Sequence, residues 1–192
     1  MHMTDTPAIN DPRFLPDVDP MFEYYLVDKP KLTYESPEDG PLARALVRVL
    51  EGFLGRHEME GHYQALKAQD IDSKMFFREA FKLTNITLDG DTSPLADIPK
   101  DRPVLFIANH PFGVIDGLIM CNMALDYAND FQVVINSLLC QDRDLVPHFL
   151  PIDFSETKEA AKRNVRSKQL AGKALANGVP LILFPSGHVS TA

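Results

Sequence analysis

The sequence has no apolar run long enough to span a membrane and no secretory signal at its start. A transmembrane helix needs about 20 consecutive apolar residues, and no run in the 192-residue chain approaches that length. The first residues, MHMTDTPAINDPRF, lack the basic and apolar regions of a signal peptide. We therefore expect a cytoplasmic protein, and this pattern still allows peripheral attachment to a membrane surface.

Cysteine and positive charge are also scarce. Cys121 and Cys140 lie in apolar segments without metal-ligand spacing, which is typical of reduced core thiols rather than of disulfides. The net charge of -8 and the isoelectric point of about 5.2 do not favour a nucleic-acid partner. With 45% hydrophobic and 24% charged residues, the chain suits a soluble domain of moderate size with its own core.

Proline content and helical periodicity divide the chain into three segments. Residues 1–41 hold seven of the fifteen prolines, which predicts an irregular Pro-rich arm because each proline removes a backbone donor. Residues 42–84 form a predicted N-terminal helical segment, and residues 85–192 a predicted α/β domain. Within the helical segment, the spacing of apolar residues predicts helices over 42–53, 58–68 and 73–83, the last with Ser73 as its N-cap.

This helical segment allows two interpretations. Its aromatic side chains, which include Phe76, Phe77 and Phe81, either cover a sheet or face lipid. In the second case, Arg78 and Lys82 lie at the polar edge of a membrane-facing surface.

From residue 85 onward, short apolar runs alternate with helical patterns, which predicts an α/β fold with a mostly parallel central sheet flanked by helices. The N-terminal helices would add a further layer. The predicted strands are residues 86–90, 103–108, 131–137, 148–153 and 180–185. The predicted helices are residues 116–128 and 156–177, with a short one near 138–145.

Polar residues follow three of these strands, where open α/β sheets bind their ligands. They are Asn109-His110, Asp153 and Ser186-Gly187-His188. An imidazole with a carboxylate on its other nitrogen can act as a general base, and Asp116 can reach His110 if Gly113 lets the loop fold back. The alternative is that Asp116 only caps the next helix. His57, His62 and His148 have no evident partner and are predicted to be surface or satisfied histidines.

Three motifs resemble those of the lysophospholipid acyltransferase superfamily, the glycerolipid acyltransferases. ANHPFGVIDG is similar to the first motif, an N-H-x4-D block, and LILFPSGHVST to the third, F-P-E-G-T-R-S. Between them, FLPIDFSETKEAAKRN is similar to the second, an apolar run that usually ends in Ile-Asp-Arg. The order agrees over residues 85–192, and the front helices resemble the lead-in of the haemolysin-like, ornithine-lipid acyltransferase branch.

The sequence departs from these motifs where the family holds charged residues. Five residues rather than four separate His110 from Asp116, and Phe154 stands at the usual arginine of the second motif. In the third motif, Ser186 and Val189 replace glutamate and arginine. The family's arginines are taken to hold an acceptor phosphate, so we expect a lyso-lipid with an amino-acid or other head group instead. The alternative is that the positive charge comes from the next helix, which carries Lys158, Lys162 and Arg163.

The resemblance implies acyl transfer from a thioester to the hydroxyl of a lyso-lipid, with acyl carrier protein or coenzyme A as the carrier and no other cofactor. His110 would take the hydroxyl proton and Asp116 would orient His110. No metal is expected, because these two side chains are the only candidate ligands with suitable spacing. Substrate contacts are predicted for Asn109, Gly113, Asp153, Lys158, Phe184, Pro185, Ser186, Gly187 and His188.

The predicted helix over residues 156–177 also has two interpretations. It carries six Lys/Arg residues, which either form a solvated face or dock on anionic lipid at about 1 kcal/mol per basic residue.

Two other functions remain open. One is a hydrolase with Ser186 as nucleophile, although the sequence lacks a G-x-S-x-G elbow. The other is a non-catalytic or truncated lipid-binding, membrane-associated domain, because the chain ends soon after Phe184 without a helix to cover the last strand. On that ground we expect residues 1–192 to be part of a longer protein.

Overall fold

A four-stranded parallel sheet forms the centre of the molecule. The computed structural model describes residues 18–28, 30, 56–69 and 71–185, without the side chains of 56–59. The strand order is β1-β4-β2-β3, and every neighbouring pair is parallel. The strands are β1 (Leu105–Ile107), β2 (Gln132–Asn136), β3 (Phe149–Ile152) and β4 (Leu181–Leu183). The predicted α/β class with a parallel sheet is confirmed.

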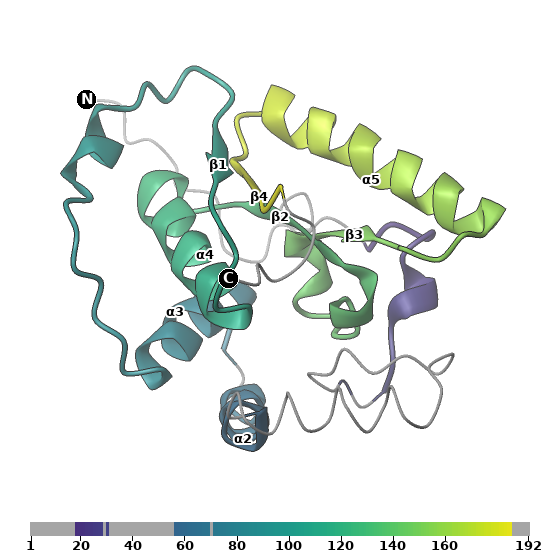
Figure 1. The fold of residues 1–192 in the computed structure, drawn as a ribbon, viewed down its shortest axis with the longest axis horizontal. Helices are drawn as coiled ribbons and strands as arrows, with labels where there is room; N and C mark the ends of the chain where they lie inside the picture. The colour runs from purple at the N-terminus through teal and green to yellow at the C-terminus, as the bar shows by residue number, and fades with distance from the viewer. Residues whose placement is uncertain (1–17, 29, 31–55, 70, 186–192) are drawn as a thin grey trace, which may run out of the picture.

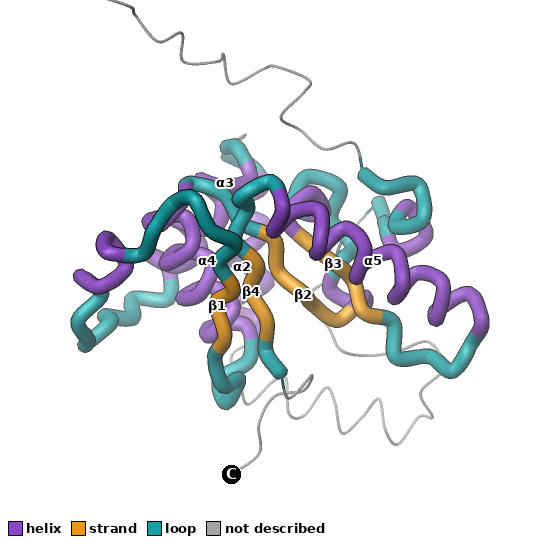
Figure 2. Tube along the Cα trace, turned by 90° about the horizontal axis from the view of Figure 1, so that it is seen from above, coloured by secondary structure: helices purple, strands orange, loops and turns teal. Residues whose placement is uncertain are grey.

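Helices cover both faces of this sheet. Helix α4 (Val114–Ala128) leads from β1 across β4 to β2, and α5 (Lys158–Ala176) leads from β3 across β2 to β4. Because the two crossovers run in opposite directions and such connections are right-handed, the two helices lie on opposite faces, as Figures 1 and 2 show. Helix α3 (Ser73–Leu83) packs against α4, and α2 (Arg56–Lys67) packs against α3.

Aromatic side chains join the helical front end to the sheet. Phe77 of α3 meets Phe131 edge-to-face at 5.0 Å and Phe149 at 6.1 Å, measured between ring centroids. Such pairs contribute about 0.5–1.5 kcal/mol each beyond their buried area. Leu125 of α4 and Ile182 of β4 are almost inaccessible to solvent. Helix α3 is therefore part of the core.

The predicted strand over residues 86–90 is wrong, because these residues form an irregular loop. The loop continues into a short 3-10 helix, η2 (Ser93–Asp97). Residues 86–90, ITLDG, have one short apolar stretch, and Leu88 within it is exposed. No described strand pairs with the segment, and a strand needs such a neighbour to satisfy its backbone groups.

The other boundaries shift by smaller amounts. The predicted short helix near 138–145 becomes two 3-10 helices, η3 (Ser137–Leu139) and η4 (Val146–His148), with a turn between them. In that turn Asp142 accepts a hydrogen bond from the backbone N–H of Asp144 at 2.9 Å, which stabilises a non-helical conformation. The N-cap of α3 is Asp72 rather than Ser73, since the Asp72 carboxylate accepts from the Met75 N–H at 2.9 Å.

Part of the N-terminal arm lies against the α/β domain. Residues 18–28 contain a 3-10 helix, η1 (Glu23–Tyr25), and the buried side chain of Phe22. Asp19 pairs with Arg166 of α5 at 2.8 Å. The predicted helix over residues 42–53 and most of the predicted arm lie outside the described residues. In the part of the chain that is described, no helix combines the length and apolar character needed to cross a bilayer.

Candidate active site

The loop between β1 and α4 folds back on itself. Gly113 has φ 60° and ψ -123°, a conformation that glycine adopts readily and that is costly for residues with a Cβ. Gly113 is also the N-cap of α4. Asp116 therefore lies in the first turn of the helix, on the side of the preceding loop. The alternative in which Asp116 is the N-cap of the helix is wrong, because Gly113 holds that position.

His110 and Asp116 face each other across this loop. His110 Nδ1 lies 3.4 Å from Asp116 Oδ2, and the two side chains are only 17% and 12% exposed. The same Oδ2 accepts a hydrogen bond from the Phe112 N–H at 2.8 Å. Nδ1 is buried and makes no well-aligned hydrogen bond within the described residues. His110 Nδ1 and Asp116 Oδ2 are therefore within ion-pair distance but do not have hydrogen-bond geometry.

The His110 ring is fixed from its other side by Phe184, which follows β4. The two rings stack with centroids 4.2 Å apart and an angle of 25° between their planes. Burial lowers the pKa of His110, and the nearby Asp116 carboxylate offsets part of this effect. The imidazole is therefore neutral at neutral pH. Since Nδ1 faces Asp116, Nε2 is the nitrogen left to accept a proton.

His110 lines a large cavity of about 920 Å³. This volume lies near the upper end of the range for small-molecule sites, about 300–1,000 Å³. Asp116 does not line the cavity and lies behind His110. Most of the wall is apolar and comes from α2, α3, the start of α4 and the ends of the strands, with Leu66, Phe76, Phe77, Ala80, Leu83, Val114, Leu118, Val134, Ile152 and Phe184 among its members.

The charge of the cavity wall is unusual for a phosphate site. Among the described residues that line it, the only carboxylate is Asp142, and none is lysine or arginine. Phe154, at the position where the resembling motif has arginine, lines the cavity and is 51% exposed. The described wall thus offers no cationic side chain to a phosphate group.

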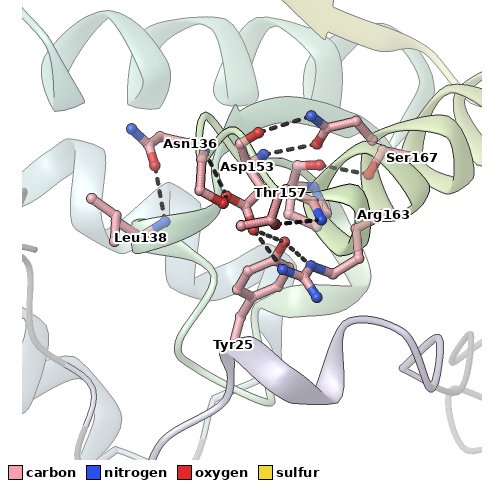
Figure 3. A network of polar contacts seen from close by, with 11 residues as sticks. Tyr25, Asn136, Leu138, Asp153, Thr157, Arg163 and Ser167 are labelled. Carbon is pink, nitrogen blue, oxygen red and sulfur yellow. Dashed lines mark hydrogen bonds and ion pairs between the residues drawn. The ribbon is translucent and has the colours of Figure 1, made fainter. Parts of the chain in front are cut away.

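Asp153 belongs to a separate polar network at the end of β3 (Figure 3). Its Oδ2 accepts hydrogen bonds from the Tyr25 hydroxyl at 2.9 Å and from Arg163 Nη2 at 2.8 Å, while Ser155 donates to Oδ1 through both its hydroxyl and its N–H. Arg163 Nε donates to the Tyr25 oxygen at 2.7 Å, and its guanidinium lies over the Tyr24 ring. Burial opposes ionisation of Asp153, but the bonds from Ser155 and Arg163 lower its pKa to about 2. The network therefore joins residues 18–28 to α5 and lies outside the cavity wall.

The remaining predicted site residues fall into three groups. Gly113, Phe184 and Pro185 line the cavity with His110. Asn109 and Lys158 are exposed and do not line it. Ser186, Gly187 and His188 lie outside the described residues.

The structure also brings in residues that sequence reasoning missed. Tyr63 of α2 and Asp142 of the β2–β3 connection line the cavity, and no local pattern in the sequence marks either of them. His62 lines it too.

His148, by contrast, is buried and held by Ser73 Oγ at 2.8 Å and the Phe131 carbonyl at 3.2 Å, so the prediction of a satisfied histidine is confirmed. Across the described residues, no group of three or more His, Cys, Asp or Glu side chains is placed to hold a metal ion.

Comparison with known protein families assigns the chain to a family. Residues 39–192, most of the chain, match the family described as Acyltransferase. The chain belongs to this acyltransferase family. No curated protein and no solved structure matches the chain significantly. Family membership confirms the acyltransferase expected from the motifs. It does not specify the branch of the family, the acyl donor or the acceptor.

Proposed function

We propose that this acyltransferase moves a fatty acyl group from a thioester, on acyl carrier protein or coenzyme A, to the hydroxyl of a lyso-lipid. The observation that carries the proposal is a neutral histidine, backed by a partly buried carboxylate, on the wall of a large apolar cavity. Such a cavity suits fatty acyl chains. Each motif that resembles the lysophospholipid acyltransferases contributes residues to the described wall, namely His110 and Gly113, Ile152 and Phe154, and Phe184 and Pro185.

In the proposed reaction, His110 Nε2 removes the proton of the acceptor hydroxyl as its oxygen attacks the thioester carbonyl carbon. Asp116 stabilises the imidazolium that forms, because its Oδ2 is 3.4 Å from Nδ1. When the tetrahedral intermediate collapses, the C–S bond breaks and the thiolate takes the proton from His110. The products are an ester and a free thiol, and no covalent acyl-enzyme forms.

The start of α4 is the proposed site of oxyanion stabilisation. Backbone N–H groups in the first turn of a helix have no partner within the helix and carry partial positive charge. Val114 and Ile115 lie in that turn and line the cavity with His110. A carbonyl oxygen that points at these N–H groups would be stabilised as negative charge develops.

The acceptor is proposed to lack a phosphate monoester and to carry an amino-acid or similar head group, as in the ornithine-lipid branch. Phe154 presents an aromatic ring to the cavity. The alternative source of charge has little support, because Arg163 already holds Asp153 and Tyr25. Lys158 and Lys162 are exposed and lie outside the described cavity wall.

We also propose that the protein is cytoplasmic and binds membranes peripherally through the outer face of α5. This face exposes Lys158, Lys162, Lys168 and Lys173, each of which contributes about 1 kcal/mol near an anionic surface. Sedimentation with anionic vesicles should deplete the wild-type protein, and replacement of the four lysines by glutamine should prevent this. Equal sedimentation of both proteins would contradict the proposal.

The test of function is thiol release from acyl-coenzyme A and acyl carrier protein thioesters with a panel of lyso-lipids. We expect release that depends on an acceptor, with lyso-lipids that carry amino-acid head groups preferred over lysophosphatidic acid. His110→Ala should lower the rate about 10²- to 10⁴-fold with an unchanged melting temperature. Acceptor-independent release would indicate a thioester hydrolase instead.

A second candidate function is a lipid-binding domain without catalysis, which the size and apolar wall of the cavity also support. Lipid binding by a folded chain that releases no thiol with any donor and acceptor would favour it over acyl transfer.

A further inference from the structure

A polar cluster interrupts the apolar wall of the cavity at α2. The Tyr63 hydroxyl donates to Asp142 Oδ2 at 2.5 Å, and Lys67 Nζ lies 3.1 Å from Asp142 Oδ1. Oδ1 also accepts from the Asp144 N–H at 2.9 Å. Tyr63 is 6% exposed and the Asp142 side chain 8%, and both line the cavity. A buried carboxylate is tolerated in an apolar wall because it is paired and hydrogen-bonded, and here those partners leave polar atoms on the cavity surface.

Tyr63 and Asp142 can still accept hydrogen bonds from a ligand, but they have no proton left to donate. Tyr63 has used its only proton on Asp142, and burial together with that bond raises the pKa of Tyr63, so the hydroxyl stays protonated. Its oxygen can still accept a hydrogen bond. Asp142 Oδ2 has one donor in the described structure and can accept another. A ligand group that fits here is therefore a donor, and because Lys67 pairs with both Asp142 and Asp144, the donor can be neutral or cationic.

The cluster lies at a distance from the base. His110 follows β1 and Asp142 follows β2, and β4 lies between these two strands. Two strand spacings amount to about 10 Å. A substrate that reaches both places must carry its donor group well away from the reacting carbonyl.

We propose that Tyr63 and Asp142 form a subsite that accepts a hydrogen bond from an N–H group of a substrate whose reacting atoms lie at His110. This inference rests on the proposed acyl transfer. Such a group occurs in two substrate classes. One is the pantetheine arm of the thioester donor, which carries amide N–H groups along its length. The other is an acceptor whose head group carries an ammonium.

The test compares Tyr63→Phe with Tyr127→Phe. Tyr127 is a matched control, because it is similarly buried (7% exposed) and its hydroxyl donates to the Pro99 carbonyl at 2.9 Å, outside the described cavity wall. Steady-state kinetics would use acyl-coenzyme A and an acyl thioester of a simple alkanethiol, which has no amide. Each donor would be combined with one acceptor that carries an amine and one that does not.

Loss of one hydrogen bond corresponds to about a 2- to 10-fold rise in KM with kcat little changed. If the thioester arm is the ligand, Tyr63→Phe should raise the KM for acyl-coenzyme A and leave that for the amide-free thioester unchanged. If the acceptor head group is the ligand, the rise should appear only with the amine-bearing acceptor. Tyr127→Phe should leave every KM unchanged. If Tyr63→Phe changes KM equally for all substrates, or for none, the subsite proposal is overturned. The Tyr63–Asp142 hydrogen bond would then only hold α2 in place.

A binding measurement separates this inference from the proposed function. Calorimetry with two unreactive probes, a pantetheine thioether and an amine-bearing lyso-lipid, needs no turnover. A wild-type chain that transfers no acyl group but binds one probe 2- to 10-fold more tightly than Tyr63→Phe would refute the transfer and retain the subsite. Failure of both probes to bind to the wild-type chain would overturn the subsite itself.

Discussion

Replacement of Asp116 by asparagine tests the proposed base most directly, because it removes a charge and retains the shape of the side chain. The Asp116 carboxylate accepts from the Phe112 N–H at 2.8 Å and faces His110 Nδ1 at 3.4 Å. The asparagine oxygen can still accept the Phe112 N–H, so the loop should keep its conformation. The same oxygen then still faces Nδ1, so the Nε2 lone pair that acts as base is retained, but the imidazolium that forms loses the negative charge that stabilises it.

The expected magnitude follows from the geometry of this pair. A hydrogen bond that involves a charged group contributes about 1.5–3 kcal/mol. The 3.4 Å contact is long, so we expect the lower part of that range, about 1.5–2 kcal/mol, or a 10- to 30-fold loss of kcat/KM. Asp116 also raises the pKa of His110 against the effect of burial. Its removal should therefore move the acid limb of the pH profile to lower pH.

The assay is thiol release as a function of pH for the wild-type chain, Asp116→Asn and Asp126→Asn. Asp126 is the matched control, because it is exposed on α4 and pairs with Arg78 at 2.8 Å. Its replacement should leave the plateau and the acid limb unchanged. A folded Asp116→Asn protein with wild-type plateau and acid limb would refute the role assigned to Asp116.

Three further predictions concern stability. Gly113→Ala should lower the free energy of unfolding in urea by about 1–3 kcal/mol, because φ is 60° and ψ is -123° there. Tyr25→Phe should cost about 1–3 kcal/mol, since its hydroxyl bridges the Asp153 network. Stability should fall as pH drops below about 6.5, because burial lowers the pKa of His148 and the unfolded chain then binds more protons. A second loss should follow below about pH 4, because Asp153 has a pKa of about 2 in the folded chain and the unfolded chain therefore binds this proton first.

Each of these predictions has its own control. Gly117 lies in the interior of α4, with open space where an added Cβ would lie. Gly117→Ala should therefore not lower the free energy of unfolding. Tyr24→Phe retains the ring that stacks on Arg163 and should cost less than Tyr25→Phe. Equal losses within either pair would contradict the reasoning. An unfolding free energy that stays constant between neutral pH and about pH 5 would contradict the pH prediction.

The sequence by itself determined most of the α/β domain, because its signals are local. A strand of a parallel sheet is buried on both faces and therefore appears as a continuous apolar run. The four runs that form β1, β2, β3 and β4 were predicted within a few residues, as were α4 and α5. The pairing of His110 with Asp116 was also accessible, since both residues lie in one short loop that a glycine allows to fold back.

The tertiary structure alone decided the strand order and the surroundings of the base. Apolar Ile86 and Leu88 alternate with polar residues as in a short strand, but no described strand lies beside this segment. Asp153 is itself a predicted substrate contact, yet Tyr25, 128 residues away, holds it outside the cavity wall. Tyr63 and Asp142 are 79 residues apart and meet only because α2 lies beside the β2–β3 connection. Such contacts depend on how distant segments pack together, and no local pattern of residues encodes them.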